Sequence, residues 1–193
     1  DRSLSRLTAD PRFDDHLRHI AHTVAAFHAS LDAVTTPYPM TTASGLAGLW
    51  AASFEAIEPS VGEVVDRTEF ERVRDLASTY LAQCGPLFDR RRELGLMRDV
   101  HGDLTADDIF ILDDGPRILD CIAFDDDYRI SDVLADIAFL VMDVERLAGQ
   151  RPAQLLLQRY CSLSGEHHPA SLAHHYVAYR AHVRAKVAAI GEG

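Results

Sequence analysis

Carboxylates recur at short intervals from residue 99 to residue 127, in the stretch DVHGDLTADDIFILDDGPRILDCIAFDDD. Asp103 follows a loop glycine, Asp108 stands five residues later at the exit of the loop, and Asp120 belongs to the second apolar run beyond it. Such acids are either solvated turn residues that cap backbone N–H groups or ligands that surround a cation. Mg²⁺ commonly takes one or two carboxylates together with water and phosphate oxygens, so this stretch could hold it.

A tight hairpin would bring two of these acids together. Residues 109–112 (IFIL) and 118–122 (ILDCI) are apolar and β-branched, and the turn sequence DDGP lies between them. The end of the second strand of a hairpin returns beside the start of the first. We therefore expect Asp120 to end the second strand close to Asp108, which makes a two-carboxylate metal site geometrically reasonable.

The rest of the chain is patterned as helices. Apolar residues at helical spacing predict six of them, at residues 14–31, 46–56, 70 to about 85, 133–147, 153–160 and 172–189. The expected fold is mainly α with a small β-hairpin (α+β), in a single domain of residues 1–193.

Charge and composition exclude several classes of function. The net charge of −11 argues against nucleic-acid and anionic-membrane binding, both of which need a basic surface. The sequence shows no signal peptide and no run of about 18 strongly apolar residues. Cys84, Cys121 and Cys161 are scattered without CxxC spacing, which favours reduced thiols in a cytoplasmic protein over disulfides or a zinc site.

Several motifs resemble one family. HGDLTADDIFIL followed by ILDCIAFDDD is similar to the catalytic core of the aminoglycoside phosphotransferase-like kinases, which include choline kinase-type enzymes and have a protein-kinase-like fold. VAAFHASL, RISDVLADIAFLVMDVE and AYRAHVRAKVAA extend the likeness over nearly the whole chain. RRRELGLMRDVHGDL resembles a subfamily in which the kinase domain is sometimes fused to a P-loop ATPase domain.

The resemblance implies a role for five residues. Asp103 would be the general base that deprotonates an acceptor hydroxyl, and Asp120 would bind Mg²⁺ that bridges the phosphates of ATP. Asp108 stands where the family usually has Asn as a second metal ligand. His101 would be a structural loop residue, and Asp136 would brace the catalytic loop from the neighbouring helix.

The chain also departs from the family pattern. Thr105 replaces a common His and Asp108 replaces Asn, which adds a negative charge beside the triphosphate. An acid is expected near Ala123 and is missing. The glycine-rich strand pair and lysine that grip the phosphates are absent, since Lys186 is the single lysine and lies in the last predicted helix. We therefore expect the C-terminal lobe alone, without its N-terminal nucleotide lobe, and poor or no activity in isolation.

Two functions follow as hypotheses. The first is an ATP- and Mg²⁺-dependent phosphotransferase lobe that transfers the γ-phosphoryl group to a hydroxyl of a small polar acceptor, such as a sugar or an aminoglycoside. The alternative is a catalytically silent pseudokinase or scaffold module that binds a partner domain, which the departures at Thr105 and Asp108 favour. A metal-dependent phosphohydrolase would need more ligands than His101 and Asp103 supply.

Other polar residues are expected to be structural. The pairs His167–His168 and His174–His175 are predicted surface histidines rather than metal ligands, because adjacent residues of a helix point in different directions. Arg180, Arg184 and Lys186 lie toward the end of the last predicted helix, where cations suit the helix dipole.

Overall fold

The chain folds as a mainly helical α+β structure, and the computed structural model describes residues 2–191. The α-helices are α1 (Phe13–Ser30), α2 (Ala43–Ile57), α3 (Arg67–Gln83), α4 (Gly85–Glu93), α5 (Asp126–Arg129), α6 (Val133–Ala148), α7 (Gln150–Ser164) and α8 (Ala170–Gly191). The strands are β1 (Met97–Asp99), β2 (Ile109–Leu112), β3 (Gly115–Ile118) and β4 (Ile130–Asp132). Short 3-10 helices cover Leu4–Arg6, Pro39–Thr41 and Glu58–Ser60. Among the described residues, no helix combines the length and the apolar character needed to cross a membrane.

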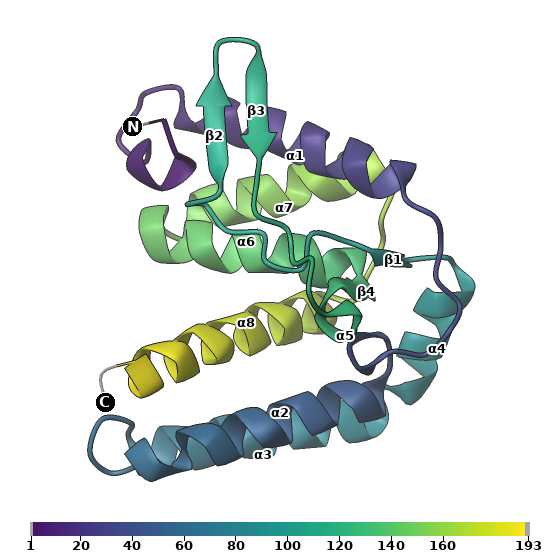
Figure 1. Cartoon of the computed structure of the whole chain (residues 1–193), viewed down its shortest axis with the longest axis vertical. Coiled ribbons are helices and arrows are strands. Elements are labelled where there is room, and N and C mark those ends of the chain that lie inside the picture. Colours follow the sequence, from purple (N-terminus) through teal and green to yellow (C-terminus); the bar gives the residue numbers. More distant parts are fainter. Residues whose placement is uncertain (1, 192–193) are drawn as a thin grey trace.

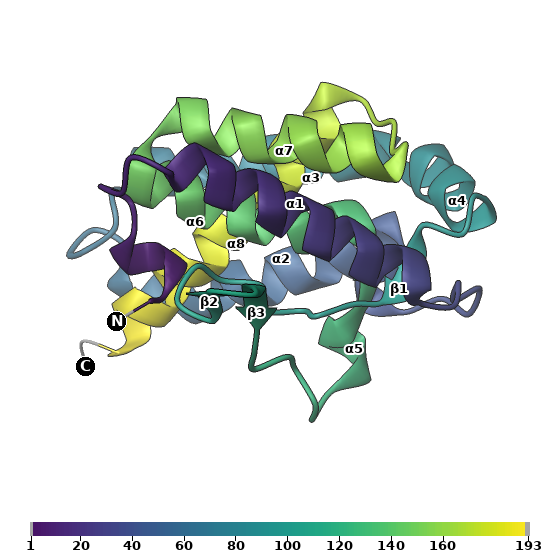
Figure 2. The ribbon, with the colours of Figure 1, turned by 90° about the horizontal axis from the view of Figure 1, so that it is seen from above.

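Helix α6 lies at the centre of the arrangement (Figure 1). It packs against α7 on one side and α8 on the other, while α1 covers α7 and the α2–α3 pair covers α8. Seen from above, α1 runs beside α7, and the β2–β3 hairpin lies against α1 (Figure 2). The predicted α+β class is therefore confirmed.

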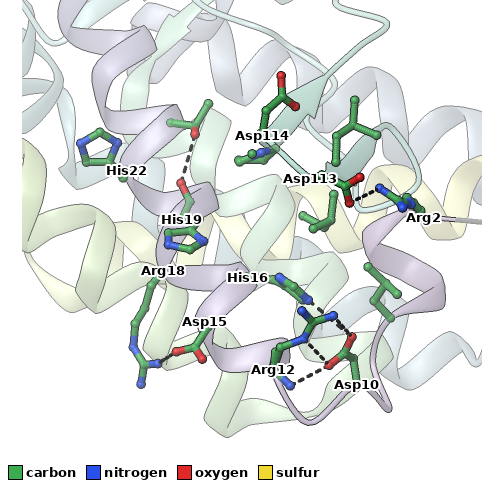
Figure 3. A pocket seen from close by; sticks show the side chains of 16 residues that line it. Arg2, Asp10, Arg12, Asp15, His16, Arg18, His19, His22, Asp113 and Asp114 are labelled. Atoms are coloured by element: carbon green, nitrogen blue, oxygen red, sulfur yellow. Dashed lines mark hydrogen bonds and ion pairs between the residues drawn. The ribbon is translucent and has the colours of Figure 1, made fainter.

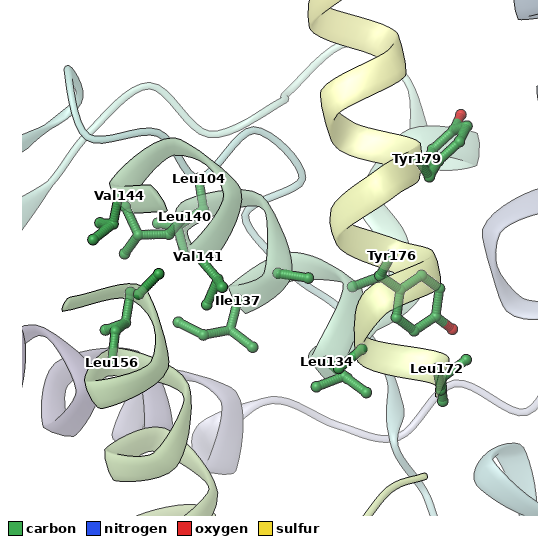
Figure 4. Close-up of a cluster of buried hydrophobic side chains, with 14 of the residues drawn as sticks. Leu104, Leu134, Ile137, Leu140, Val141, Val144, Leu156, Leu172, Tyr176 and Tyr179 are labelled. Carbon is green, nitrogen blue, oxygen red and sulfur yellow. The ribbon is translucent and has the colours of Figure 1, made fainter. Parts of the chain in front are cut away.

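The position of α6 follows from its sequence. Every residue from Val133 to Val144 is buried, and all of them except Asp136 and Asp143 are apolar, as expected of a helix inside a core. Its Ile137, Leu140 and Val144 lie in one cluster with Leu156 of α7 and with α8 side chains such as Leu172 (Figure 4).

The second strand of the hairpin is shorter than predicted and lies earlier in the chain. β2 coincides with the predicted residues 109–112, but β3 ends at Ile118, so Asp120 does not end a strand. The register pairs Ile109 with Ile118 and Leu112 with Gly115, which leaves a turn of only two residues. Pro116 is tolerated inside β3 because a two-stranded sheet leaves one side of each strand free of ladder hydrogen bonds.

Several further elements were missing from the sequence-based expectation, among them α4, β1 and β4. Gly85–Pro86 was expected to end helical structure, but α4 begins there with proline in its first turn, where the missing N–H costs nothing. The short strands β1 and β4 pair in antiparallel register, with Met97 opposite Asp132. Strands of three residues carry too little pattern to be recognised in a sequence.

The surface prediction for the histidines was wrong for His175, which is buried. The indole N–H of Trp50 donates to His175 Nε2 at 3.2 Å, and the ring of Tyr80 stacks on the imidazole. Burial lowers the pKa of His175 to about 4, so this histidine is a neutral core residue near pH 7. Its neighbour His174 is exposed, as expected of adjacent residues on a helix.

A buried arginine joins three helices. Arg91 of α4 hydrogen-bonds through Nε and Nη2 to both carboxylate oxygens of Asp132, which caps α6, and the Nη2–Oδ1 distance is 2.8 Å. Tyr176 of α8 donates its hydroxyl to Asp132 Oδ2 at 3.1 Å. Burial alone would lower the pKa of Arg91, but the hydrogen bond and charge of Asp132 outweigh it and raise the pKa. Arg91 therefore stays positively charged inside the core.

We expect Arg91→Met to lower the free energy of unfolding by about 3–5 kcal/mol, because it leaves the Asp132 carboxylate buried without its counter-charge. Arg90→Met is the matched control. Arg90 lies one residue away in an exposed pair with Glu93, so its loss should cost less than about 1 kcal/mol. Urea unfolding at pH 7 measures both variants, and equal losses would contradict the assigned role of Arg91.

Candidate functional site

Two segments without regular structure meet beside α6. The first is the loop of residues 100–108 between β1 and β2, here called the acid loop, and the second is residues 119–122 after β3, here called the return segment. Three hydrogen bonds join them. Leu119 N–H donates to Asp108 O at 3.0 Å, Ile122 N–H donates to His101 O at 3.0 Å, and His101 Nε2–H donates to Leu119 O at 2.8 Å.

These hydrogen bonds place Asp120 beside the acid loop, although Asp120 does not end a strand as predicted. Asp120 lies between two residues that are bonded to the loop, and its backbone is left-handed, with φ at 63°. Asp adopts this conformation at lower cost than most residues with a Cβ. The side chain of Asp120 is exposed, and so is that of Asp103, while Asp108 is partly buried.

Two buried carboxylates of α6 hold the acid loop from beneath. Gly102 N–H donates to Asp136 Oδ1 at 2.8 Å, and Ala106 N–H donates to Asp143 Oδ2 at 3.0 Å. Asp136 and Asp143 are seven residues apart, so they lie about 20° from each other around the helix axis. Asp136 therefore hydrogen-bonds to the acid loop from the neighbouring helix. Asp143 makes a second hydrogen bond of this kind, which the sequence analysis did not predict.

Asp136 also connects the loop to α1 and α7. Its Oδ2 lies 3.0 Å from His28 Nε2, and His28 Nδ1 lies 2.8 Å from the Tyr160 hydroxyl. Burial alone would raise the pKa of Asp136, but the hydrogen bonds from His28 and Gly102 outweigh it and hold the pKa below its usual value. A buried, ionised carboxylate therefore fixes the loop backbone.

Glycine is required at position 102. Its φ is +83°, and an added Cβ would stand 3.1 Å from Ile122 Cδ1 in the return segment. A residue with a Cβ would crowd the Ile122 side chain and would strain the backbone at this positive φ.

Asp108 keeps one carboxylate oxygen available. The Thr105 hydroxyl donates to Asp108 Oδ2 at 2.6 Å, and within residues 2–191 no hydrogen bond occupies Oδ1. The hydroxyl stabilises the negative charge that Asp108 carries in place of an amide.

The environment of Asp103 shifts its acidity. Partial desolvation of the carboxyl group and the nearby Asp108 charge raise the pKa of Asp103, while Arg180, His101 and Arg184 oppose that rise. Asp103 therefore lies within electrostatic reach of one acid and of two arginines from α8.

Arg180 is a site residue that the sequence analysis assigned to the helix dipole. It lies in the middle of α8 and is buried, with its guanidinium 4.7 Å from the ring centroid of Phe139. Among the described residues, its Nε and Nη2 atoms have no hydrogen-bond partner. The sequence did contain an indication that Arg180 is buried. Arg180 stands four residues after Tyr176, so it lies on the same apolar face of the helix.

The geometry predicts opposite shifts of the Asp103 pKa in two variants. Asp108→Asn removes a negative charge and should lower the pKa of Asp103, whereas Arg180→Gln removes a positive charge and should raise it further. Carboxyl-carbon NMR titration of Asp103 measures both shifts. Asp114→Asn, in the exposed hairpin turn, should leave the value unchanged. Shifts of the same sign in both variants would contradict this arrangement.

A large cavity lies elsewhere. It has a volume of about 960 Å³ and opens between the N-terminal segment, α1 and the hairpin turn (Figure 3). None of the predicted site residues lines it. Its arginines are engaged in ion pairs with acids of the same cavity: Arg2 with Asp113, Arg12 with Asp10, and Arg18 with Asp15. The cavity therefore offers no concentrated charge to a ligand.

Comparisons with known proteins identify relatives without a described activity. No family model matches the chain. The uncharacterized protein Rv2004c of Mycobacterium tuberculosis (strain ATCC 25618 / H37Rv) is 34% identical over 186 residues, which cover 96% of this chain and 37% of that protein. The uncharacterized protein Mb2027c of Mycobacterium bovis matches with the same identity and coverage. The chain thus spans about 37% of the length of these curated relatives.

A solved structure was also found. The chain is similar to a glucosamine kinase (crystal form A) with a TM-score of 0.43 and 17% sequence identity, over 96% of this chain and 44% of that one.

Proposed function

We propose that the chain is the metal- and acceptor-binding lobe of an ATP- and Mg²⁺-dependent phosphotransferase that acts on a hydroxyl of a small polar molecule. The observation that carries the proposal is the junction of the acid loop with the return segment. It brings Asp103, Asp108 and Asp120 onto neighbouring backbone segments. The motifs that resemble the aminoglycoside phosphotransferase-like kinases support the same conclusion.

The donor atoms suit magnesium. Asp120 and Asp108 offer carboxylate oxygens, which are the hard ligands that Mg²⁺ prefers, and water and phosphate oxygens complete its octahedral shell in proteins of this kind. Bound ATP would supply the phosphoryl group, and bound Mg²⁺ would neutralise the charge on the phosphates. Asp108 in place of Asn leaves more negative charge in the site, and the Thr105 hydroxyl disperses part of it.

The remaining roles belong to the protein. Asp103 orients the acceptor hydroxyl and accepts its proton, and its raised pKa makes the carboxylate a stronger base than an ordinary Asp. The guanidinium of Arg180 lies within electrostatic reach of Asp103, where its positive charge favours the ionised form of Asp103 and attracts anionic oxygens. The backbone of the acid loop stays in place through Asp136 and Asp143.

The proposal also includes partners outside this chain. The glycine-rich strands and the lysine that grip the donor phosphates would belong to a separate nucleotide lobe. A fused or associated P-loop ATPase domain remains a prediction from the sequence resemblance. The acceptor would be a sugar, an aminoglycoside or a similar polar alcohol.

Magnesium binding tests the metal site. Titration calorimetry with Mg²⁺, with and without ATP, should show millimolar or tighter binding to the wild-type chain and none to Asp120→Ala. Asp114→Ala removes an exposed acid from the neighbouring hairpin turn and should bind as the wild type does. Equal binding by wild type and Asp120→Ala would refute the assigned ligand and favour the alternative of a silent module that binds a partner domain.

The role of Asp103 requires an activity measurement. In a protein that contains this chain together with its nucleotide lobe, Asp103→Asn should reduce phosphoryl transfer to an acceptor panel about 10²–10⁴-fold. The same substitution should leave Mg²⁺ affinity nearly unchanged, because Asp103 is not a proposed ligand. A variant that retains wild-type turnover would exclude Asp103 as the base.

A further inference from the structure

A second group of reactive side chains lies away from the acid loop, at the end of α7. Cys161 stands in the last turn of the helix, and Gly165, with a φ of +68°, reverses the chain so that Glu166 and His168 return beside it. In residues 2–191, this is the one set of three His, Cys, Asp or Glu side chains whose ligand atoms all lie within 4.8 Å of one another.

The distances suit a tetrahedral cation. Zinc bonds of about 2.3 Å to sulfur and about 2.0–2.2 Å to nitrogen or oxygen place neighbouring ligand atoms roughly 3.3–3.7 Å apart. Cys161 Sγ lies 3.9 Å from Glu166 Oε2, and His168 Nδ1 hydrogen-bonds to the same oxygen. The sulfur already stands at nearly the required separation, and a small rotation of His168 would open the space for an ion.

The surroundings hold Glu166 in position. Its side chain is buried, and Oε1 lies 2.6 Å from Arg91 Nη1 as an ion pair. Arg91 also donates to the His167 carbonyl at 3.4 Å, and the Glu166 N–H donates to the Ser164 hydroxyl at 3.3 Å. Outer contacts of this kind orient the ligands of metal sites.

The local charge leaves room for a cation. Arg91 is shared between Asp132 and Glu166, so two carboxylates face one guanidinium, and His168 is the other basic group bonded to Glu166. Burial and Glu166 raise the pKa of the Cys161 thiol to about 11 in the metal-free chain. A bound cation must therefore displace the thiol proton to solvent, and it must also displace the proton that His168 Nδ1 donates to Glu166.

We propose that Cys161, Glu166 and His168 bind a divalent cation of the zinc type, with a fourth position open to water. A thiolate and an imidazole favour zinc over the hard ion magnesium, so this site differs in kind from the carboxylates of the acid loop. Cys161 and His168 are only partly buried, which gives an ion access from solvent. The inference is independent of the proposed phosphotransferase, and it differs from the expectation from the sequence that this cysteine and histidine bind no metal.

Cobalt titration followed by absorbance tests the site, because Co²⁺ bound to a thiolate gives a charge-transfer band and a tetrahedral visible spectrum. The wild-type chain should show both, and Zn²⁺ should abolish them. Cys161→Ser should lose the charge-transfer band, and His168→Gln should bind about tenfold more weakly. The matched controls are Cys121→Ser, which removes the exposed thiol, and His167→Gln, which changes the adjacent exposed histidine.

Three outcomes would overturn the inference. The wild type could show no thiolate–cobalt band, the band could disappear in Cys121→Ser instead, or His168→Gln could bind cobalt as tightly as His167→Gln does. Circular dichroism verifies that each variant is folded. If Cys161→Ser does not fold, the comparison of His168→Gln with His167→Gln decides alone.

Discussion

The structure depends on the need to satisfy three buried carboxylates along α6. Asp132, Asp136 and Asp143 are all fully buried in the most apolar part of the molecule. A charge in that position is tolerated only with partners close by and well aligned. Each carboxylate therefore holds in place the group to which it is bonded. Asp132 holds the Arg91 guanidinium of α4, and Asp136 and Asp143 hold the backbone of the acid loop.

The acids at and beneath the acid loop divide into two groups with different tasks. Asp136 and Asp143 of α6 face inward, are hydrogen-bonded and hold the loop backbone in place. Asp103 and Asp120 face solvent, and Asp108 keeps one oxygen free among the described residues. The acid loop carries Asp103 and Asp108 and the return segment carries Asp120, and neither segment has regular secondary structure. The conformation of the acid loop therefore depends on its hydrogen bonds to Asp136 and Asp143. Regular structure is not needed to position these side chains, since α6 does so through hydrogen bonds.

Arg91 connects this arrangement to the other end of α6. It binds Asp132 on one side and contacts Glu166 and the His167 carbonyl on the other. The α7–α8 connection is therefore ordered by the same buried charge network that caps α6. A cation bound by Glu166 would lie next to that network, so its binding would add directly to the stability of the folded chain.

The sequence by itself determined six of the α-helices, the first hairpin strand and the residues of the acid loop, because periodicity and turn chemistry are local properties. It did not reveal that β3 ends at Ile118, or that the return segment bonds to His101 and Asp108. Nor did it show that Arg180 and His175 are buried, or that Cys161 meets His168. These outcomes depend on contacts between elements that are far apart in the sequence. Only tertiary packing decides which polar groups become buried and therefore need hydrogen-bond or ion-pair partners.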